Sequence, residues 1–171
     1  MMTPSRSGCP INAAVEVLGD RWSLIVLRDI IFGDRRYFRT LQRESDEGIA
    51  SNILASRLRD LVEIGLLTRE ESGPGRRAAY SLTEAAIQLV PVLAELGWWG
   101  LRYRPMSEPL RVRAQLLHDG GPPLWTDFMN ELRETHLDIA VPNTNRPSVR
   151  DQLDNAYAQA TDTIVKDHAA Q

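Results

Sequence analysis

A polar, glycine-rich tip between two short apolar segments constrains the fold of this 171-residue chain more than any other feature. Residues 66–70 and 79–82 have the composition of strands, and residues 72–75 (Ser-Gly-Pro-Gly) have that of a tight turn. The sequence therefore predicts one antiparallel hairpin. The segments on either side of it have the apolar spacing typical of helices, so the predicted fold class is mainly α with a small β-hairpin (α+β).

Three helices are predicted at the start of the chain. Pro10 suits the first turn of a short helix that ends at Gly19. Asp20 suits the N-cap of a second helix, over residues 21–32, whose many apolar side chains make it a core helix. A short third helix follows over residues 38–44.

A fourth helix, over residues 51–64, follows a polar turn at residues 45–48. Ser51 can cap its start, and Gly65 can end it. Leucines share one face of this helix: Leu54, Leu58 and Leu61. Polar side chains share the opposite face: Asn52, Ser56, Arg59 and Glu63. This order of helices, turn, helix and hairpin is that of a winged helix-turn-helix, in which the helix after the turn enters the DNA major groove.

A long helix is predicted after the hairpin, over residues 84–104, with Thr83 as its cap and a bend at Pro91. Its large apolar side chains exceed what a small domain can cover alone, which indicates a partner surface.

The chain beyond Pro105 looks more loosely organised. Breakers at residues 119–123 and 141–147 flank an amphipathic helix over residues 124–137, and a final helix covers residues 148–168. We therefore expect two domains, residues 1–104 and a helical extension over residues 105–171.

The charge of the chain is unevenly distributed. A formal net charge of −3 argues, taken alone, against binding nucleic acid. However, residues 1–104 hold 14 of the 20 basic and 13 of the 23 acidic residues, so the acidity lies mainly in the extension. All basic residues except Lys166 are arginines, whose planar fork suits phosphate.

Eight motifs in the first domain form one pattern: Cys9-Pro10, VLGDRWSLIVLRD at 17–29, GDRRYF at 33–38, GIAS at 48–51, LASRLRDL at 54–61, Gly65-Leu66, YSLT at 80–83 and PVL at 91–93. Over about residues 9–104 the chain resembles the HxlR-type regulators, a MarR-related branch of bacterial winged-helix transcription factors. It departs from the family in having Ala86 where glycine is common and in its extension, which many relatives lack.

The resemblance implies a sequence-specific DNA-binding transcriptional regulator, commonly a repressor, that binds an inverted-repeat operator in double-stranded DNA as a homodimer. It also implies that the dimer is built from the first helix and the long helix after the hairpin. The interface residues expected on these helices are Ile11, Val15, Val90, Leu93, Leu96, Trp98 and Leu101. No cofactor is expected.

Ten polar side chains are expected at the DNA. Those best placed to reach the groove are Ser51, Asn52, Ser56 and Arg59, because amide and guanidinium groups can pair with base edges. Arg57 suits a phosphate or an internal salt bridge. Those expected on phosphates are Arg36, Arg39 and Arg43 from the third helix and its approach, and Arg76 and Arg77 beside the hairpin tip.

Cys9, the only cysteine, cannot form an internal disulfide, but it precedes a helix whose dipole favours a thiolate. Some relatives sense oxidants or electrophiles at this place, which makes redox modulation a hypothesis; the alternative is a helix-end residue without a sensing role. His118, His136 and His168 lack metal-site spacing and are expected at the surface. We expect no catalytic residue and no metal, and hence no enzyme.

The function of the chain and the role of the aromatic residues in the extension each allow two interpretations. The main alternative function is a winged-helix module that binds a protein or small molecule and not DNA, with the acidic extension as its partner surface. In the extension, Trp125, Phe128 and Tyr157 could line an effector pocket or pack in a core. Because no apolar run approaches the roughly 20 residues of a membrane span, we expect a cytoplasmic protein with no membrane partner.

Overall fold

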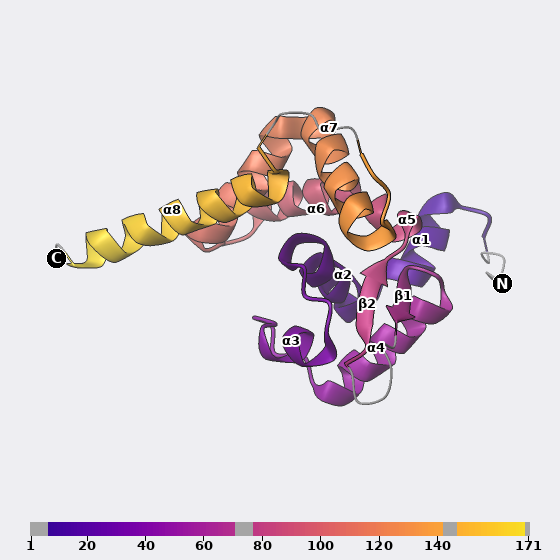
Figure 1. Cartoon of the computed structure of the whole chain (residues 1–171). Coiled ribbons are helices and arrows are strands. Elements are labelled where there is room, and N and C mark those ends of the chain that lie inside the picture. Colours follow the sequence, from indigo (N-terminus) through magenta and orange to yellow (C-terminus); the bar gives the residue numbers. More distant parts are fainter. Residues whose placement is uncertain (1–6, 71–76, 142–146, 170–171) are drawn as a thin grey trace. The chain divides into compact units, whose positions relative to one another are not determined.

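The computed structural model describes residues 7–70, 77–141 and 147–169. The chain forms two compact units, Met1–Ile87 and Gln88–Gln171. The described residues are mainly helical with one two-stranded antiparallel sheet, which confirms the predicted fold class (Figure 1).

The first unit contains the helix-turn-helix and the hairpin. Its elements in chain order are α1 (Pro10–Leu18), α2 (Arg21–Gly33), α3 (Phe38–Arg43), α4 (Ser51–Glu63), β1 (Leu67–Glu70), β2 (Ala79–Leu82) and α5 (Glu84–Ile87). α4 packs on α2, α3 and β1, so the core of this unit lies between α2 and α4.

α2 is the central helix of the first unit, as predicted. The Asp20 carboxylate accepts hydrogen bonds from the backbone N–H and the hydroxyl of Ser23, both at 3.0 Å, and so caps the helix. Asp34 ends it in the left-handed conformation, with φ of 47°. The fully buried side chains of α2 are Val26, Leu27, Ile30 and Ile31, whereas Trp22 and Ile25 are only half-buried.

α4 buries the predicted leucines, since Leu54, Leu58 and Leu61 are at most 1% exposed. The prediction that Ser51 caps it is wrong: the N-cap position is Ala50, and no side chain caps the helix there. Gly65 ends it with φ of +79°, which allows Leu66 to donate its N–H back to the Leu61 carbonyl at 2.9 Å.

The hairpin pairs β1 with β2 in the register Leu67↔Leu82 to Glu70↔Ala79. Tyr37 forms a bridge with Ala79, so the segment before α3 adds to the free side of β2. The predicted tip at residues 72–75 and Arg76 lie outside the described residues.

The predicted long helix after the hairpin is interrupted. α5 ends at Ile87, and α6 (Val90–Tyr103) begins after a turn, with Pro91 in its first helical turn. Proline lacks an N–H and would clash with the carbonyl four residues earlier, so the helix breaks here instead of bending. The Thr83 hydroxyl does not cap α5 but donates to the Gly65 carbonyl at 2.7 Å.

The second unit consists of α6, α7 (Glu108–Leu137) and α8 (Val149–Ala169). α7 packs on both neighbours, and Leu117, Phe128, Leu132, Val149 and Leu153 are buried in this unit. The expectation of a loosely organised extension is therefore wrong. The first half of α7 is a helix that was not predicted from the sequence. Because α6 packs on α7, the compact units divide after Ile87 and not at the expected boundary after residue 104.

A carboxylate of α7 caps α8. Glu131 accepts the backbone N–H groups of Val149 and Arg150, the latter at 3.2 Å, and the Ser148 hydroxyl at 3.0 Å. These bonds satisfy helix-end donors and place a negative charge at the positive end of the helix dipole. Glu131 thereby fixes the start of α8 to α7. No helix in the described part of the chain is long and apolar enough to cross a membrane.

Candidate nucleic-acid interface

The polar face of α4 is open to solvent. Asn52 and Arg59 are exposed, Ser56 is half-buried, and Ser51 is exposed at the start of the helix. The buried leucines hold the opposite face against the core, so these polar side chains project from a rigid helix. This is the geometry that direct reading of base edges needs.

Arg36 is tied to the hairpin. Its guanidinium donates to the Tyr80 carbonyl at 3.4 Å and to the Ser81 hydroxyl, and its own carbonyl accepts the Tyr80 N–H at 2.8 Å. Arg36 therefore joins the approach of α3 to β2, a role that its place in an arginine cluster did not indicate.

Arg57 also has internal partners. It forms ion pairs with Asp60 at 2.9 Å and with Asp20 at 3.5 Å, and its side chain is 30% exposed. The Asp20 contact joins α4 to the start of α2. Of the two roles that the sequence left open for Arg57, the structure contains the internal salt bridge.

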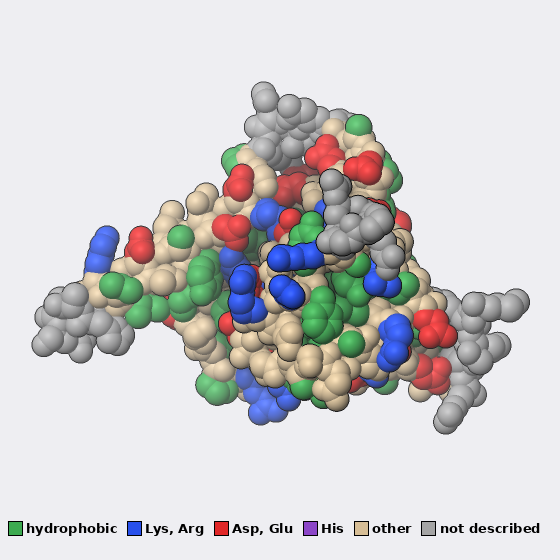
Figure 2. Space-filling view, turned by 60° about the horizontal axis from the view of Figure 1, so that its bottom comes forward, with side chains coloured by type: hydrophobic (Ala, Val, Ile, Leu, Met, Phe, Trp, Pro, Cys, Tyr) green, Lys and Arg blue, Asp and Glu red, His purple; other side chains and the backbone are tan. Residues whose placement is uncertain are grey.

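Among the described arginines that were predicted at the DNA, three exposed ones have no ion-pair partner in the described part of the chain: Arg39 on α3, Arg59 on α4 and Arg77 before β2. Arg43 pairs with Glu44 at 2.6 Å, yet its side chain remains 78% exposed. Figure 2 shows basic side chains in small separate groups, with acidic and apolar side chains between them. Among the described residues, binding of phosphates thus depends on individual exposed arginines.

A partly buried ion network that is centred on Asp29 was not predicted from the sequence. Asp29, only 4% exposed, pairs with Arg28 at 2.7 Å and with Arg35 at 3.2 Å. Arg28 also donates two hydrogen bonds to the Glu47 carboxylate, at 2.6 and 2.9 Å, and these bonds lower the pKa of Glu47. The network ties α2 to the polar turn before α4. Acidic and basic residues inside the core helix, at positions 28 and 29, were the available signal.

A family model described as HxlR-like helix-turn-helix matches residues 17–108, which is more than half of the chain. The chain belongs to this family. The matched segment contains the helix-turn-helix, the hairpin and α6.

Several known proteins are similar to this HxlR-like chain. Rv3095 of Mycobacterium tuberculosis, an uncharacterised HTH-type transcriptional regulator, is 39% identical over 109 residues, which are 62% of this chain and 67% of the relative. YdeP of Bacillus subtilis, another uncharacterised HTH-type transcriptional regulator, is 32% identical over 61% of this chain and 81% of its own. The solved structure of PA1607 aligns with a TM-score of 0.54 and 34% identity, over 60% of this chain and 70% of that chain. The family and these regulators are not enzymes, which confirms that expectation.

The apolar side chains expected at a dimer interface of this HxlR-like protein differ in exposure. Ile11 is 74% exposed and Val15 57%, and α1 has no buried residue. On α6, Val90 and Leu93 are buried within the chain, and Trp98 and Leu101 are half-buried. The open face of α6 is instead formed by side chains at helical spacing, each about half exposed: Val92, Leu96, Trp99 and Tyr103.

The histidines and Cys9 take different positions. His136 is buried, so its expected surface position is wrong, and His118 stacks on Trp98 with ring centroids 3.7 Å apart. The His168 side chain lies outside the described residues. Cys9 is exposed at the N-cap of α1, and its side chain makes no capping hydrogen bond. Across residues 7–70, 77–141 and 147–169, no group of three or more potential ligands could hold a metal ion.

Proposed function

We propose that this HxlR-like protein is a sequence-specific DNA-binding transcriptional regulator that represses its target as a homodimer on an inverted-repeat operator. The observation that carries the proposal is the exposed polar face of α4, which presents Asn52 and an unpaired Arg59 from a helix whose other face is locked in the core. Residues 1–104 would supply both DNA binding and dimerisation.

The side chains of α4 would read the major groove. Asn52 can make paired hydrogen bonds to adenine, and Arg59 can make them to guanine. Ser51 and Ser56 would add shorter contacts. Arg39, Arg43, Arg76 and Arg77 would bind phosphates and set the register of the helix in the groove. Arg36 and Arg57 would act by holding β2 and α4 in place.

The dimer would use the exposed apolar faces of α1 and α6. Ile11 and Val15 on α1, together with Leu96 and Trp99 on α6, expose apolar area that water disfavours. An inverted repeat requires two copies of the recognition helix related by a twofold axis, which a homodimer provides.

A footprint on the DNA upstream of the protein's own gene tests this proposal. We expect two protected half-sites about 10 base pairs apart, centre to centre, with inverted symmetry. Deleting the gene should then raise transcription from the footprinted promoter. Absence of protection at protein concentrations up to the non-specific range, near 1 µM, would contradict the proposal.

Cys9 offers a route for oxidants to change DNA binding. The thiol is exposed at the N-cap of α1, one of the two helices proposed for the dimer. With one thiol per chain, oxidation can end in a disulfide between subunits or in a mixed disulfide with a small thiol.

We expect diamide to change operator affinity of the wild-type protein several-fold and to leave Cys9→Ser unaffected, as measured by fluorescence anisotropy. The Cys9→Ser protein without oxidant should bind like the reduced wild type. An equal diamide response of both proteins would remove Cys9 from the mechanism.

A further inference from the structure

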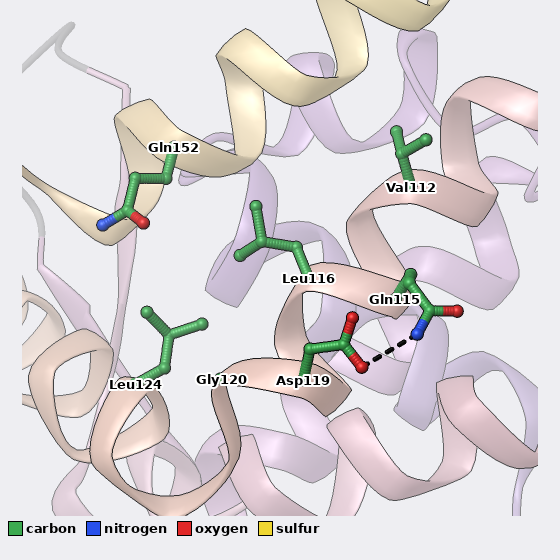
Figure 3. A pocket seen from close by; sticks show the side chains of 7 residues that line it. All are labelled: Val112, Gln115, Leu116, Asp119, Gly120, Leu124 and Gln152. Carbon is green, nitrogen blue, oxygen red and sulfur yellow. Dashed lines mark hydrogen bonds between the residues drawn. The ribbon is translucent and has the colours of Figure 1, made fainter.

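A hollow of about 500 Å³ lies in the second unit, where α7 folds back on itself beside the start of α8 (Figure 3). The first half of α7 contributes most of its wall, with Leu124 from the second half and Gln152 from α8. The lining residues are Val112, Gln115, Leu116, Asp119, Gly120, Leu124 and Gln152. Its volume falls within the range of small-molecule sites.

Two adjacent glycines create the bend that opens this hollow. Gly121 has φ of 55° and ψ of −155°, a conformation that side-chain-bearing residues avoid, and it breaks α7 into two helical segments. At Gly120, a Cβ would lie only 2.6 Å from Leu124 Cβ, so this position requires glycine for the two segments to approach. The shape of the hollow is thus built into the backbone.

The polar side chains of the hollow are one carboxylate and two glutamine amides, and each of them makes one hydrogen bond within the chain. The Gln115 amide donates to one oxygen of Asp119 at 2.9 Å, and the Gln152 amide donates to the Pro147 carbonyl at 3.0 Å. The second Asp119 oxygen remains available as an acceptor, and each glutamine amide keeps its oxygen and a second N–H. Figure 3 shows Asp119 and Gln152 on opposite sides of Leu116, with the Gln115–Asp119 bond on the Asp119 side.

Asp119 is the only charged lining residue, and it has no ion-pair partner among the described residues. The apolar part of the wall is formed by Val112, Leu116 and Leu124. A ligand that matches this arrangement has an apolar body and a positively charged head with several N–H donors. An anion would be repelled by the Asp119 charge.

We propose that this hollow is a binding site for a small organic amine, with the ammonium group on Asp119 and the apolar body on Leu116 and Leu124. The site gives the regulator a place for a small effector. The effector role rests on the proposed function. Binding of the amine does not, because it is measured on the full-length protein without DNA.

Three isosteric probes test the site by isothermal titration calorimetry: 4-phenylbutylamine, 4-phenylbutanol and 4-phenylbutanoate. They share the apolar body and differ in the head group, which is cationic, neutral or anionic at pH 7. We expect the amine to bind at least tenfold more tightly than the alcohol and the carboxylate not to bind. Asp119→Asn should reduce amine affinity to that of the alcohol and leave alcohol affinity unchanged.

Asp162→Asn is the matched control, since it removes the same charge from an exposed position on α8 outside the hollow. It should bind all three probes like the wild type. The proposal is overturned if the amine does not bind at 10 mM, if it binds no better than the alcohol, or if Asp119→Asn and Asp162→Asn have equal effects. Loss of operator binding in a separate DNA assay would bear on the proposed function and leave this result intact.

Discussion

Truncating Leu58 to alanine is expected to lower the free energy of unfolding by about 2–5 kcal/mol. Leu58 is 1% exposed on the buried face of α4, which packs on α2, α3 and β1. The substitution removes apolar contact area and leaves a cavity that a helix fixed on three sides cannot close by shifting. Since small domains have only about 5–15 kcal/mol in total, this loss is a large share of the stability.

Urea unfolding followed by circular dichroism measures this loss. Leu58→Met is the matched control, because it nearly conserves volume and should cost less than about 1.5 kcal/mol. Equal midpoints for the alanine variant and the wild type would show that α4 is not anchored by its leucine face. The orientation of its polar face would then need another explanation.

Much of the first unit could be predicted because its signals are local. Asp20 lies three residues before the N–H that it caps, and Gly65 ends α4 by its own backbone conformation. The leucines of α4 follow the helical period, so their common burial required no knowledge of the rest of the fold. The hairpin was predicted from strand composition on both sides of a turn sequence.

The second unit was less predictable because its order comes from distant contacts. Two glycines and two prolines at 120–123 indicated a break before a helix over residues 124–137, whereas they form a kink inside α7. The cap of α8 is supplied by Glu131, 18 residues before Val149 in the chain. A local sequence pattern cannot reveal a capping side chain that lies on another helix.

The roles of the individual arginines also depend on contacts with distant residues, which a local sequence pattern does not reveal. Arg36 and Arg43 belong to one cluster in the sequence, yet Arg36 bonds to Ser81, 45 residues away, while Arg43 stays 78% exposed. Residue type and clustering identify which side chains can bind phosphate. Only the folded structure separates the arginines that are tied to distant parts of the chain from those that stay exposed.

Combined replacement of Arg39, Arg59 and Arg77 by alanine is expected to weaken operator binding at least a hundredfold. Arg59→Ala alone should cost about 1–3 kcal/mol and relax specificity at the base it contacts, because paired bonds to guanine are lost. Removal of Arg39 and Arg77 should weaken binding to all DNA sequences equally. It should also lower the salt slope by about one for each phosphate contact removed.

Fluorescence anisotropy on the footprinted operator between 50 and 200 mM salt separates the loss of base specificity from the loss of phosphate contacts. The matched charge control is Arg111→Ala, which replaces an exposed arginine of α7. Its affinity should equal that of the wild type, because it removes one positive charge, as each single replacement does, but outside the helix-turn-helix. The alternative function, a winged-helix module that binds a protein or a small molecule, makes the opposite prediction: the three arginines could be removed without consequence for partner binding. A triple variant that keeps wild-type operator affinity and salt slope would therefore exclude the α4 face as the reader of DNA.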